Sequence, residues 1–367
     1  MMADVGGHER APAAGAARSQ RVARVRDQLP IGTVDRFGAE LARGLLAAGV
    51  GDRARWLSHD AIEGRLLAPV VVDPDWPEPT PPFPVGSGAV HADLTDDDHE
   101  AFARLRSSLR LDAGASPVPD AERLAAAAQE WRLPVTPYRR PDADWAALVA
   151  RCDQGSTHAA EPSASSGAAP AGDTPLVVDL TALWAGPLAT SLLAELGAEV
   201  IKVDSDARPD GLREHPAVYR HLNGAKTIID LDLRTDHGRG HLDRLLARAD
   251  LLIDSFSRRV LPNLGYGPDQ LAQRFPRLRS VGIVAFPRGC PEAEWVSYGP
   301  GVHAISGLGH RPDGRCRPAP IAYPDALAGA TAFADAAELL SGRRTDRRVE
   351  RSLAGAVAPL LDRADPS

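Results

Sequence analysis

The sequence predicts an α/β protein, in which a mostly parallel sheet carries helices on both faces and a smaller, irregular α/β region precedes it. Hydrophobic residues make up 44% of the 367 residues and charged residues 25%, which is typical of a soluble protein with a substantial core. From residue 176 onward, short apolar runs alternate with segments of helical periodicity, as in parallel sheets. Before that point, helical patterns are broken by a proline-rich stretch.

Composition and charge exclude several classes of protein. The formal net charge of −7 argues against a protein that wraps a nucleic-acid backbone. Cys152, Cys290 and Cys316 have no C-x-x-C spacing, so we expect a reducing compartment and neither a disulfide framework nor a zinc site. No apolar run approaches the roughly 20 residues of a membrane span, and residues 1–30 lack the apolar core of a secretory signal. We therefore expect a cytoplasmic protein without a membrane or nucleic-acid partner.

Composition divides the chain into four parts. Residues 1–30 are rich in Ala, Arg and Gly without periodicity and are predicted to form a disordered tail. Residues 31–152 are predicted to form the small α/β region, and residues 175–367 the larger domain. Between them, residues 153–174 are small, polar and rich in Ser, Gly and Pro, which is typical of a linker.

The small region is predicted from several helical patterns and one apolar run. Apolar residues recur every four positions from Phe37 to Leu45 and predict a helix over 34–50. The run LAPVVVD at 67–73 predicts a short buried strand. Prolines exclude the stretch WPEPTPPFP at 76–84 from helices and central strands. Further helices are expected at 97–110, 120–131 and 143–152.

The larger domain begins with a strand–helix–strand unit. LVVDL at 176–180 predicts a strand, AGPLATSLLAELG at 185–197 a helix, and AEVIKVD at 198–204 a second strand. Such a unit is expected to be parallel and right-handed. The elements that follow are expected at 227–233 (strand), 237–250 (helix), 251–256 (strand), 267–275 (helix), 278–286 (strand), 325–341 (helix), 347–353 (edge strand) and 354–364 (helix).

The turn after the first strand of this unit does not carry a nucleotide-binding motif. It has a single glycine, Gly186, followed by Pro187, rather than G-x-G-x-x-G. The sequences G-x-x-x-x-G-K-[ST] and G-x-S-x-G are also missing, which argues against a P-loop and against a serine hydrolase of that fold. His237 and His241 lie four residues apart but lack the glutamate of a metalloprotease helix, so no metal site is predicted.

Two further features point to chemistry. Asp325 directly precedes a long apolar helix, where its carboxylate is either an N-cap or a nucleophile kept ionised by the positive end of the helix dipole. A cluster of cations forms either a phosphate-facing fringe or a solvated rim. The cluster comprises Lys202, Arg208, Arg213, Arg220 and Lys226.

Residues 175–361 resemble the class III CoA-transferase family, also called CaiB/BaiF-like, which includes formyl-CoA:oxalate and carnitine CoA-transferases and the alpha-methylacyl-CoA racemases. Five blocks in the family's order carry the resemblance. They are VVDLTALWAGPLATSLLAELGAEVIKVD (177–204), LNGAKTIIDLDL (222–233), ADLLIDSFSRRVLPNLGYG (249–267), YGPGVHAISGL (298–308) and the segment from YPDALAG to the end of the match (323–361).

The resemblance implies an acyl-CoA:carboxylate CoA-transferase with Asp325 as nucleophile, because the family's I-A-D-Y-L-A-G-like segment matches YPDALAG at 323–329. The reaction it implies moves CoA between an acyl-CoA and a carboxylic acid through an aspartyl-CoA intermediate, without a metal. It also implies an α/β CoA-binding domain and an interlocked homodimer. The CoA contacts it implies are Trp184, Ala185, Gly186, Pro187, Arg213, Asn223, Lys226, Ser255 and Phe256.

The chain also departs from the family's pattern. Ser255 stands where the family has the asparagine of E-N-F, and Tyr298 stands where the racemases place a histidine, although tyrosine is a poor base at neutral pH. Tyr298 and His303 are candidates to face the substrate. The family's small domain has no counterpart after Leu361, and residues 121–139 are similar to segments of the family's other half. An acyl-CoA racemase or isomerase and a non-catalytic CoA-binding homologue are the alternative functions.

Overall fold

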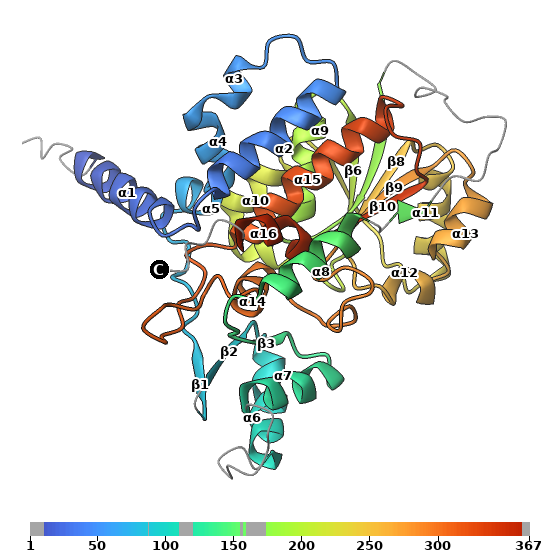
Figure 1. The fold of residues 1–367 in the computed structure, drawn as a ribbon. Coiled ribbons are helices and arrows are strands. Elements are labelled where there is room, and N and C mark those ends of the chain that lie inside the picture. The colour runs from blue at the N-terminus through green and yellow to red at the C-terminus, as the bar shows by residue number, and fades with distance from the viewer. Residues whose placement is uncertain (1–10, 87, 110–119, 155–156, 159–173, 362–367) are drawn as a thin grey trace, which may run out of the picture.

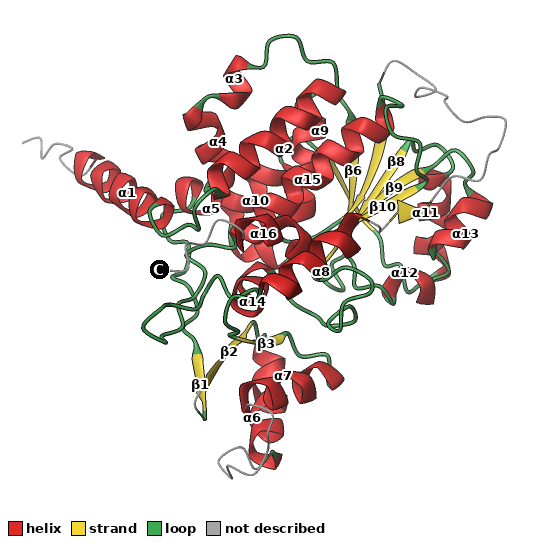
Figure 2. Ribbon diagram, in the orientation of Figure 1, coloured by secondary structure: helices red, strands yellow, loops and turns green. Residues whose placement is uncertain are grey.

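A seven-stranded sheet forms the centre of the protein. The computed structural model describes residues 11–86, 88–109, 120–154, 157–158 and 174–361. In spatial order the strands are β4 (Thr157–His158), β10 (Arg348–Ser352), β9 (Arg279–Val284), β8 (Leu251–Asp254), β5 (Leu176–Leu180), β6 (Glu199–Asp204) and β7 (Thr227–Asp230). Figure 2 shows the strands as a twisted fan between layers of helices. The predicted α/β class with a mostly parallel sheet is confirmed.

The strand order creates a crevice beside β5. All neighbouring strands are parallel except β4, which pairs antiparallel with β10 at the edge. The chain fills one side of β5 with β6 and β7 and then returns to build β8, β9 and β10 on the other side. In open α/β sheets, ligands bind beyond the carboxyl ends of the two strands where the order reverses, here β5 and β8. The strand predicted at 347–353 is therefore second from the edge, because β4 covers it.

Both faces of this sheet are covered because its central strands are apolar on both sides. Val177 belongs to the core on one face and Val178 to the core on the other. Eight α-helices and a short 3-10 helix follow β5 in the described chain. They are α9 (Ala185–Glu195), the 3-10 helix (Gly211–Glu214), α10 (Pro216–Asn223), α11 (Asp236–Leu246), α12 (Val260–Asn263), α13 (Pro268–Arg274), α14 (Gly299–Ile305), α15 (Tyr323–Leu340) and α16 (Leu353–Leu361). Among the described residues, none of the helices is both long and apolar enough to cross a bilayer.

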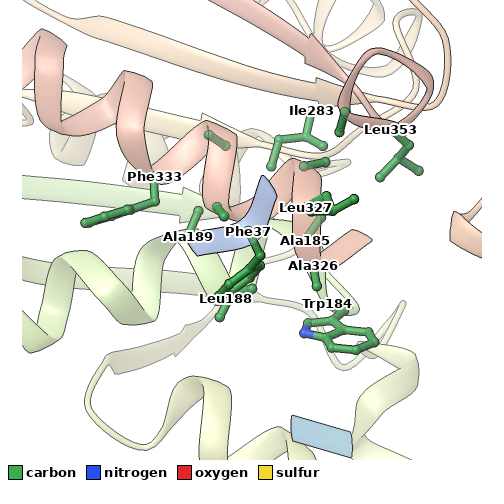
Figure 3. Close-up of a cluster of buried hydrophobic side chains, with 14 of the residues drawn as sticks. Phe37, Trp184, Ala185, Leu188, Ala189, Ile283, Ala326, Leu327, Phe333 and Leu353 are labelled. Atoms are coloured by element: carbon green, nitrogen blue, oxygen red, sulfur yellow. The ribbon is translucent and has the colours of Figure 1, made fainter. Parts of the chain in front are cut away.

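The described chain begins with five helices, and the second and fourth of them pack against α15. They are α1 (Ala11–Arg26), α2 (Thr33–Ala47), α3 (Ala54–Leu57), α4 (His59–Leu66) and α5 (Ala68–Val72). Phe37 joins the same core cluster as Leu188 and Phe333, as Figure 3 shows. Gly44 lets α2 approach α15 closely, because a Cβ at Gly44 would lie 2.3 Å from the Phe333 ring. Segments before and after the predicted linker therefore share one hydrophobic core.

Ion pairs reinforce the contact between α2 and α15. The Asp335 side chain is fully buried and accepts from Arg43 at 3.0 Å, Arg344 at 3.0 Å and Arg351 at 2.6 Å. These arginines come from α2, from the loop after α15 and from β10. A buried carboxylate needs such compensation, so this cluster fixes the N-terminal region to the sheet.

Two predictions for the N-terminal region differ from the structure. The segment 67–73 is the helix α5 rather than a strand, with Val71 N bonded to Leu67 O at 3.1 Å and Asp73 N to Pro69 O at 3.0 Å. A short apolar run does not distinguish a strand from a buried helix, and Pro69 suits the first turn of a helix. The segment 1–30 contains the helix α1, which projects from the body in Figure 1. Residues 1–10, 155–156 and 159–173 lie outside the described residues, so most of the predicted linker does too.

A second, smaller sheet lies below α14 in Figure 1. It consists of the antiparallel strands β1 (Phe83–Val85), β2 (Gly88–Ala92) and β3 (Val135–Pro137). The helices α6 (Asp96–Ser108) and α7 (Asp120–Glu130) pack against it, and α8 (Ala143–Gln154) then runs back to α16. The apolar face of the small sheet, with Val90 and Val135, forms a separate core with Phe102 and Leu124.

Candidate active site

Asp325 lies in the first turn of α15, where its side chain is almost completely shielded from solvent. The residue is only 7% exposed, and its Oδ2 atom has no hydrogen-bond partner among the described residues. The helix starts at Tyr323-Pro324, where proline suits the first turn because that turn leaves its N–H groups unbonded. The structure shows no side-chain cap at this start, so Asp325 is not the N-cap that its position also allowed.

The surroundings of Asp325 hold its carboxyl group partly protonated near neutral pH. Burial, together with the negative charge of Asp93, raises the pKa of Asp325 to about 7. The backbone amides of Gly299 and Asp325 pull this pKa in the opposite direction. Because an ionised carboxylate with few hydrogen bonds is a better nucleophile than a hydrated one, this environment suits attack on a carbonyl carbon.

Two glycines make room for the carboxylate. A Cβ at Gly299, the first residue of α14, would lie 1.9 Å from Asp325 Oδ2. A Cβ at Gly329, one turn after Asp325, would lie 2.5 Å from the Ala185 carbonyl oxygen. The start of α15 is therefore pressed between the start of α14 and the start of α9.

The turn after β5, predicted to contact CoA, lies beside this helix start. Trp184, Ala185, Gly186 and Pro187 are all buried, and Figure 3 shows Trp184 and Ala185 next to Ala326. The indole N–H of Trp184 has no partner among the described residues. Gly186 is required here, because a Cβ would lie 2.2 Å from Thr181.

The loop after β8 meets the loop after β5 at the crevice. The Ser255 hydroxyl accepts a hydrogen bond from Ala182 N at 3.1 Å. Phe256 packs against the core on the opposite face of the sheet. The structure thus brings Trp184 to Pro187 and Ser255 together at the strand ends where ligands of this fold class bind.

Lys226, predicted to contact CoA, is buried in an ion pair. Its amine donates to Asp179 at 3.1 Å, to the Pro187 carbonyl at 3.0 Å and to Asn223 at 2.8 Å. Burial alone would raise the pKa of Asp179, but Lys226 and Lys202 lower it to about 2. The Lys226 amine therefore links the start of α9 to the end of α10, and its three N–H groups are used in hydrogen bonds inside the protein.

Arg213 and Asn223, also predicted to contact CoA, line a cavity near the ends of β6 and β7. The cavity has a volume of about 470 Å³. Its lining residues are Arg213, Pro216, Tyr219, Arg220, Asn223, Gly224 and Ile228. Arg213 also pairs with Asp204 at 2.9 Å and with Asp206 at 2.7 Å. The sequence signal for Tyr219 is the i, i+3, i+4 spacing that places Pro216, Tyr219, Arg220 and Asn223 on one side of α10.

His303 and Tyr298 occupy different environments. His303 is buried, with Nδ1 2.8 Å from the Tyr323 hydroxyl and Nε2 3.1 Å from the Arg317 carbonyl. Burial lowers the pKa of His303 to about 3, so the ring is neutral, donates from Nε2 and accepts at Nδ1. His303 therefore positions the start of α15 from the core, rather than facing a substrate. Tyr298 directly precedes α14, does not cap that helix with its side chain, and is 36% exposed.

The small sheet contributes residues that the sequence analysis did not identify. His91, Asp93 and Tyr138 each have a buried polar side-chain atom without a hydrogen-bond partner among the described residues. The charge of Asp93 acts on both Asp325 and Tyr298. The sequence carried a weak signal, since the spacing His-Ala-Asp on a strand places His91 and Asp93 on one face.

No metal centre emerges from these side chains. Within the described part of the chain, His, Cys, Asp and Glu side chains do not gather into groups of three or more that would hold a metal ion.

The sequence model of the CoA-transferase family III matches residues 175–364, which is just over half of the chain. The chain belongs to the CoA-transferase family III. The predicted family is thereby confirmed, and the matched segment contains β5 to β10 and Asp325.

Relatives in this family share only part of the chain. A probable CoA-transferase from Mycobacterium tuberculosis is 34% identical over 140 residues, which are 36% of this chain and 17% of that protein. The succinate–glutarate CoA-transferase from Agrobacterium fabrum is 32% identical over 170 residues, which are 42% of each protein. The crystal structure of a CaiB/BaiF family protein from Brucella suis is 26% identical with a TM-score of 0.47, over 53% of this chain and 56% of that one. The chain spans less than half the length of the two relatives compared by sequence.

Proposed function

We propose that this protein transfers CoA between an acyl-CoA thioester and a carboxylic acid, with Asp325 as the nucleophile. The observation that carries the proposal is the Asp325 carboxylate, buried at a helix start with Oδ2 unpartnered among the described residues. Membership in the family and the contact of this helix with Ala185, in the turn after β5, support it.

The proposed reaction proceeds by acyl exchange at Asp325. A carboxylate oxygen attacks the thioester carbonyl, the C–S bond breaks, and an aspartyl–acyl anhydride and a CoA thiolate form. The thiolate then attacks the aspartyl carbonyl carbon, which releases the first acid and leaves an aspartyl-CoA thioester. The acceptor carboxylate attacks that thioester and frees the thiolate again. Attack of the thiolate on the acceptor's carbonyl gives the new acyl-CoA and restores the Asp325 carboxylate.

The surrounding residues have distinct parts in this proposal. We assign to the backbone amides of Gly299 and Asp325, which act on the Asp325 carboxyl group, the role of stabilising the negative charge that develops on the attacked oxygen. The cavity lined by Arg213 and Arg220 offers cations for the phosphates of CoA. Trp184 and Ser255, at the crevice between them and Asp325, are the proposed neighbours of the pantetheine arm.

Trapping with hydroxylamine tests the nucleophile. The protein is incubated with acetyl-CoA and hydroxylamine, which converts an aspartyl anhydride or thioester into an aspartyl hydroxamate. Fragment mass spectrometry is expected to place the hydroxamate on Asp325. Asp335 on the same helix is the internal control, because its carboxylate is bound by three arginines and must stay unmodified.

Three outcomes separate the candidate functions. Loss of the label in Asp325→Asn, with CoA binding retained in calorimetry, supports the transferase. Exchange of the α-proton of a branched acyl-CoA in deuterated water, without any label, would favour the racemase or isomerase instead. Binding of CoA without label or exchange would indicate a non-catalytic homologue and contradict the proposal.

A further inference from the structure

One face of the small sheet is polar although it is buried. His91 pairs with Thr136 across the two strands, and Asp93 follows two residues after His91, so the three side chains share a face. Tyr138 lies diagonally from His91 on that face, and their rings meet edge-on with centroids 6.5 Å apart. His91 is 1% exposed and Tyr138 is 8% exposed. An antiparallel sheet with one apolar face ordinarily turns its polar face to water, so this burial needs a cause.

The polar face is fixed against the helix that backs Asp325. The Thr136 hydroxyl donates to the Gly301 carbonyl at 3.0 Å, and Arg139 N donates to the Ala304 carbonyl at 3.1 Å. Both acceptors belong to α14, whose first residue, Gly299, abuts the Asp325 carboxylate. The small sheet and the proposed nucleophile therefore contact the same short helix.

Polar atoms on this face remain unpaired. The His91 Nε2 atom lies 2.9 Å from Asp93 Oδ1 and fixes both side chains. His91 Nδ1, Asp93 Oδ2 and the Tyr138 hydroxyl are buried and have no hydrogen-bond partner among the described residues. Unpaired buried polar atoms destabilise a fold unless a ligand or water pairs with them. Three of them on one face, together with the unpaired Oδ2 of Asp325, indicate a ligand site.

Charge decides which ligand fits. Asp93 Oδ2 accepts hydrogen bonds, and so does His91 Nδ1 when Nε2–H donates to Asp93. Asp93 and Asp325 already bring two carboxylates to the region, so a second carboxylate on the ligand would meet repulsion. Arg208, whose positive charge also reaches Tyr298, is exposed and does not belong to the small sheet.

We propose that the polar face of His91, Asp93 and Tyr138 is a specificity subsite for a substrate acid that carries a hydrogen-bond donor, a hydroxyl or an ammonium group, a few bonds from its reacting carboxyl carbon. This inference rests on the proposed function, since it concerns the acid that Asp325 would handle. The Tyr138 hydroxyl and Asp93 Oδ2 bind the donor group. Dicarboxylates, such as the succinate and glutarate in the name of one relative, are disfavoured.

Four acyl-CoA probes of equal chain length test the subsite. Butyryl-CoA, 3-hydroxybutyryl-CoA, 3-aminobutyryl-CoA and succinyl-CoA are compared by CoA release in hydroxylamine at pH 8, where Asp325 is ionised. We expect kcat/KM for at least one donor-bearing probe to exceed that for butyryl-CoA at least tenfold. Only such a probe can donate a hydrogen bond to the Asp93 carboxylate, which butyryl-CoA would leave unpaired. The faster of the two probes identifies the donor as hydroxyl or ammonium. Succinyl-CoA is expected to be the slowest.

Variants attribute the preference to this face. In Asp93→Ala and in Tyr138→Phe, the ratio of donor-bearing probe to butyryl-CoA is expected to fall by roughly tenfold. Asp93→Asn removes the charge but keeps an acceptor, so it should admit succinyl-CoA. Asp120→Asn, on α7 of the same unit and paired with Arg123 at 3.0 Å, is the matched control and should keep the wild-type ratio.

Other results would overturn the subsite. Equal kcat/KM values for the donor-bearing probes and butyryl-CoA, or a preference that survives Asp93→Ala, would mean that water alone satisfies these atoms. If no probe modifies Asp325, the proposed function fails. The subsite is then judged by calorimetry with free 3-hydroxybutyrate, 3-aminobutyrate and butyrate, where a donor-bearing acid must bind at least tenfold more tightly than butyrate, and equal affinities contradict the subsite.

Discussion

At the scale of single residues, the burial of Asp325 suits its proposed role as a nucleophile but lowers the stability of the folded protein. Its carboxyl group is buried beside Gly299 and feels the charge of Asp93, which together raise its pKa to about 7. An ionised carboxylate here lacks the hydration that it has in the unfolded chain. The same environment that activates the nucleophile therefore opposes folding at alkaline pH.

The pH dependence of trapping follows from this pKa. Below about pH 7, the rate of hydroxamate formation at Asp325 should rise about tenfold per pH unit, and it should level off above that value, because only the carboxylate attacks. Asp93→Asn removes a nearby negative charge, so it should move the midpoint to lower pH. Stopped assays across pH 5–9 measure both curves. A midpoint near that of a free aspartate in the wild type would contradict the buried environment.

Stability should depend on pH through the same group. Because the folded-state pKa of Asp325 lies above the usual 3.8, the folded protein binds the proton more tightly, and stability falls as pH rises from about 4 to 7. The Asp325→Asn variant should not show this fall in stability, because an amide does not titrate. The difference in unfolding free energy between variant and wild type should grow by about 3 kcal/mol from pH 5 to pH 8. Urea titrations at the two pH values measure it, and a constant difference would argue against it.

Lys226 illustrates what a sequence does not reveal about a cation. The spacing and the resemblance predicted a CoA contact, while burial and pairing with Asp179 depend on the packing of α9 against α10. Lys226→Ala should lower the free energy of unfolding by about 3–5 kcal/mol, because Asp179 would remain buried without its main partner. Denaturant unfolding measures this loss, with Arg220→Ala at the exposed cavity rim as the control. If Lys226→Ala leaves the stability unchanged but weakens CoA binding, Lys226 contacts the phosphates of CoA instead.

At the scale of elements, the starts of α9, α14 and α15 define the site. The sequence predicted the first and third of these helices closely, since 185–197 and 325–341 compare with Ala185–Glu195 and Tyr323–Leu340. Their apolar periodicity and terminal residues are local signals. How closely the helix starts approach one another is a tertiary property, and the sequence showed only that small residues are present there.

Gly299→Ala tests this close approach. The added Cβ would lie 1.9 Å from Asp325 Oδ2, and the carboxylate can rotate away because it is the end of a flexible side chain. We expect the trapping rate to fall by roughly a hundredfold, since a displacement of about 1 Å is enough for such a loss. The thermal midpoint should change little. A full trapping rate, or global unfolding, would show that Gly299 does not shape the site in this way.

At the scale of the whole molecule, the two halves of the chain are not independent. Composition alone indicated a boundary at 153–174, yet α2 packs on α15 and α8 packs on α16. The sequence did not reveal this because contacts over such separations leave no periodic pattern. The small sheet was missed for a similar reason, since its strands are only three to five residues long.

Splitting the chain tests the shared core. Residues 166–367 expressed alone should be insoluble or molten, because Phe37, Leu41 and Leu45 would no longer cover α15. Co-expression with residues 1–165 should restore a soluble complex with cooperative thermal unfolding. A well-folded 166–367 fragment, judged by a sharp unfolding transition, would show that the N-terminal half is dispensable for the sheet.

The pairing of Arg43 with Asp335 also affects how the protein folds during its synthesis. The two residues are separated by 292 positions. At roughly 5–20 residues per second of ribosomal synthesis, the apolar side of α2 waits on the order of 15–60 seconds for its partner to be translated. During that interval the apolar face of α2 is exposed on the nascent chain and is prone to aggregation. We therefore expect the yield of folded protein in cells to depend on chaperones that bind this face.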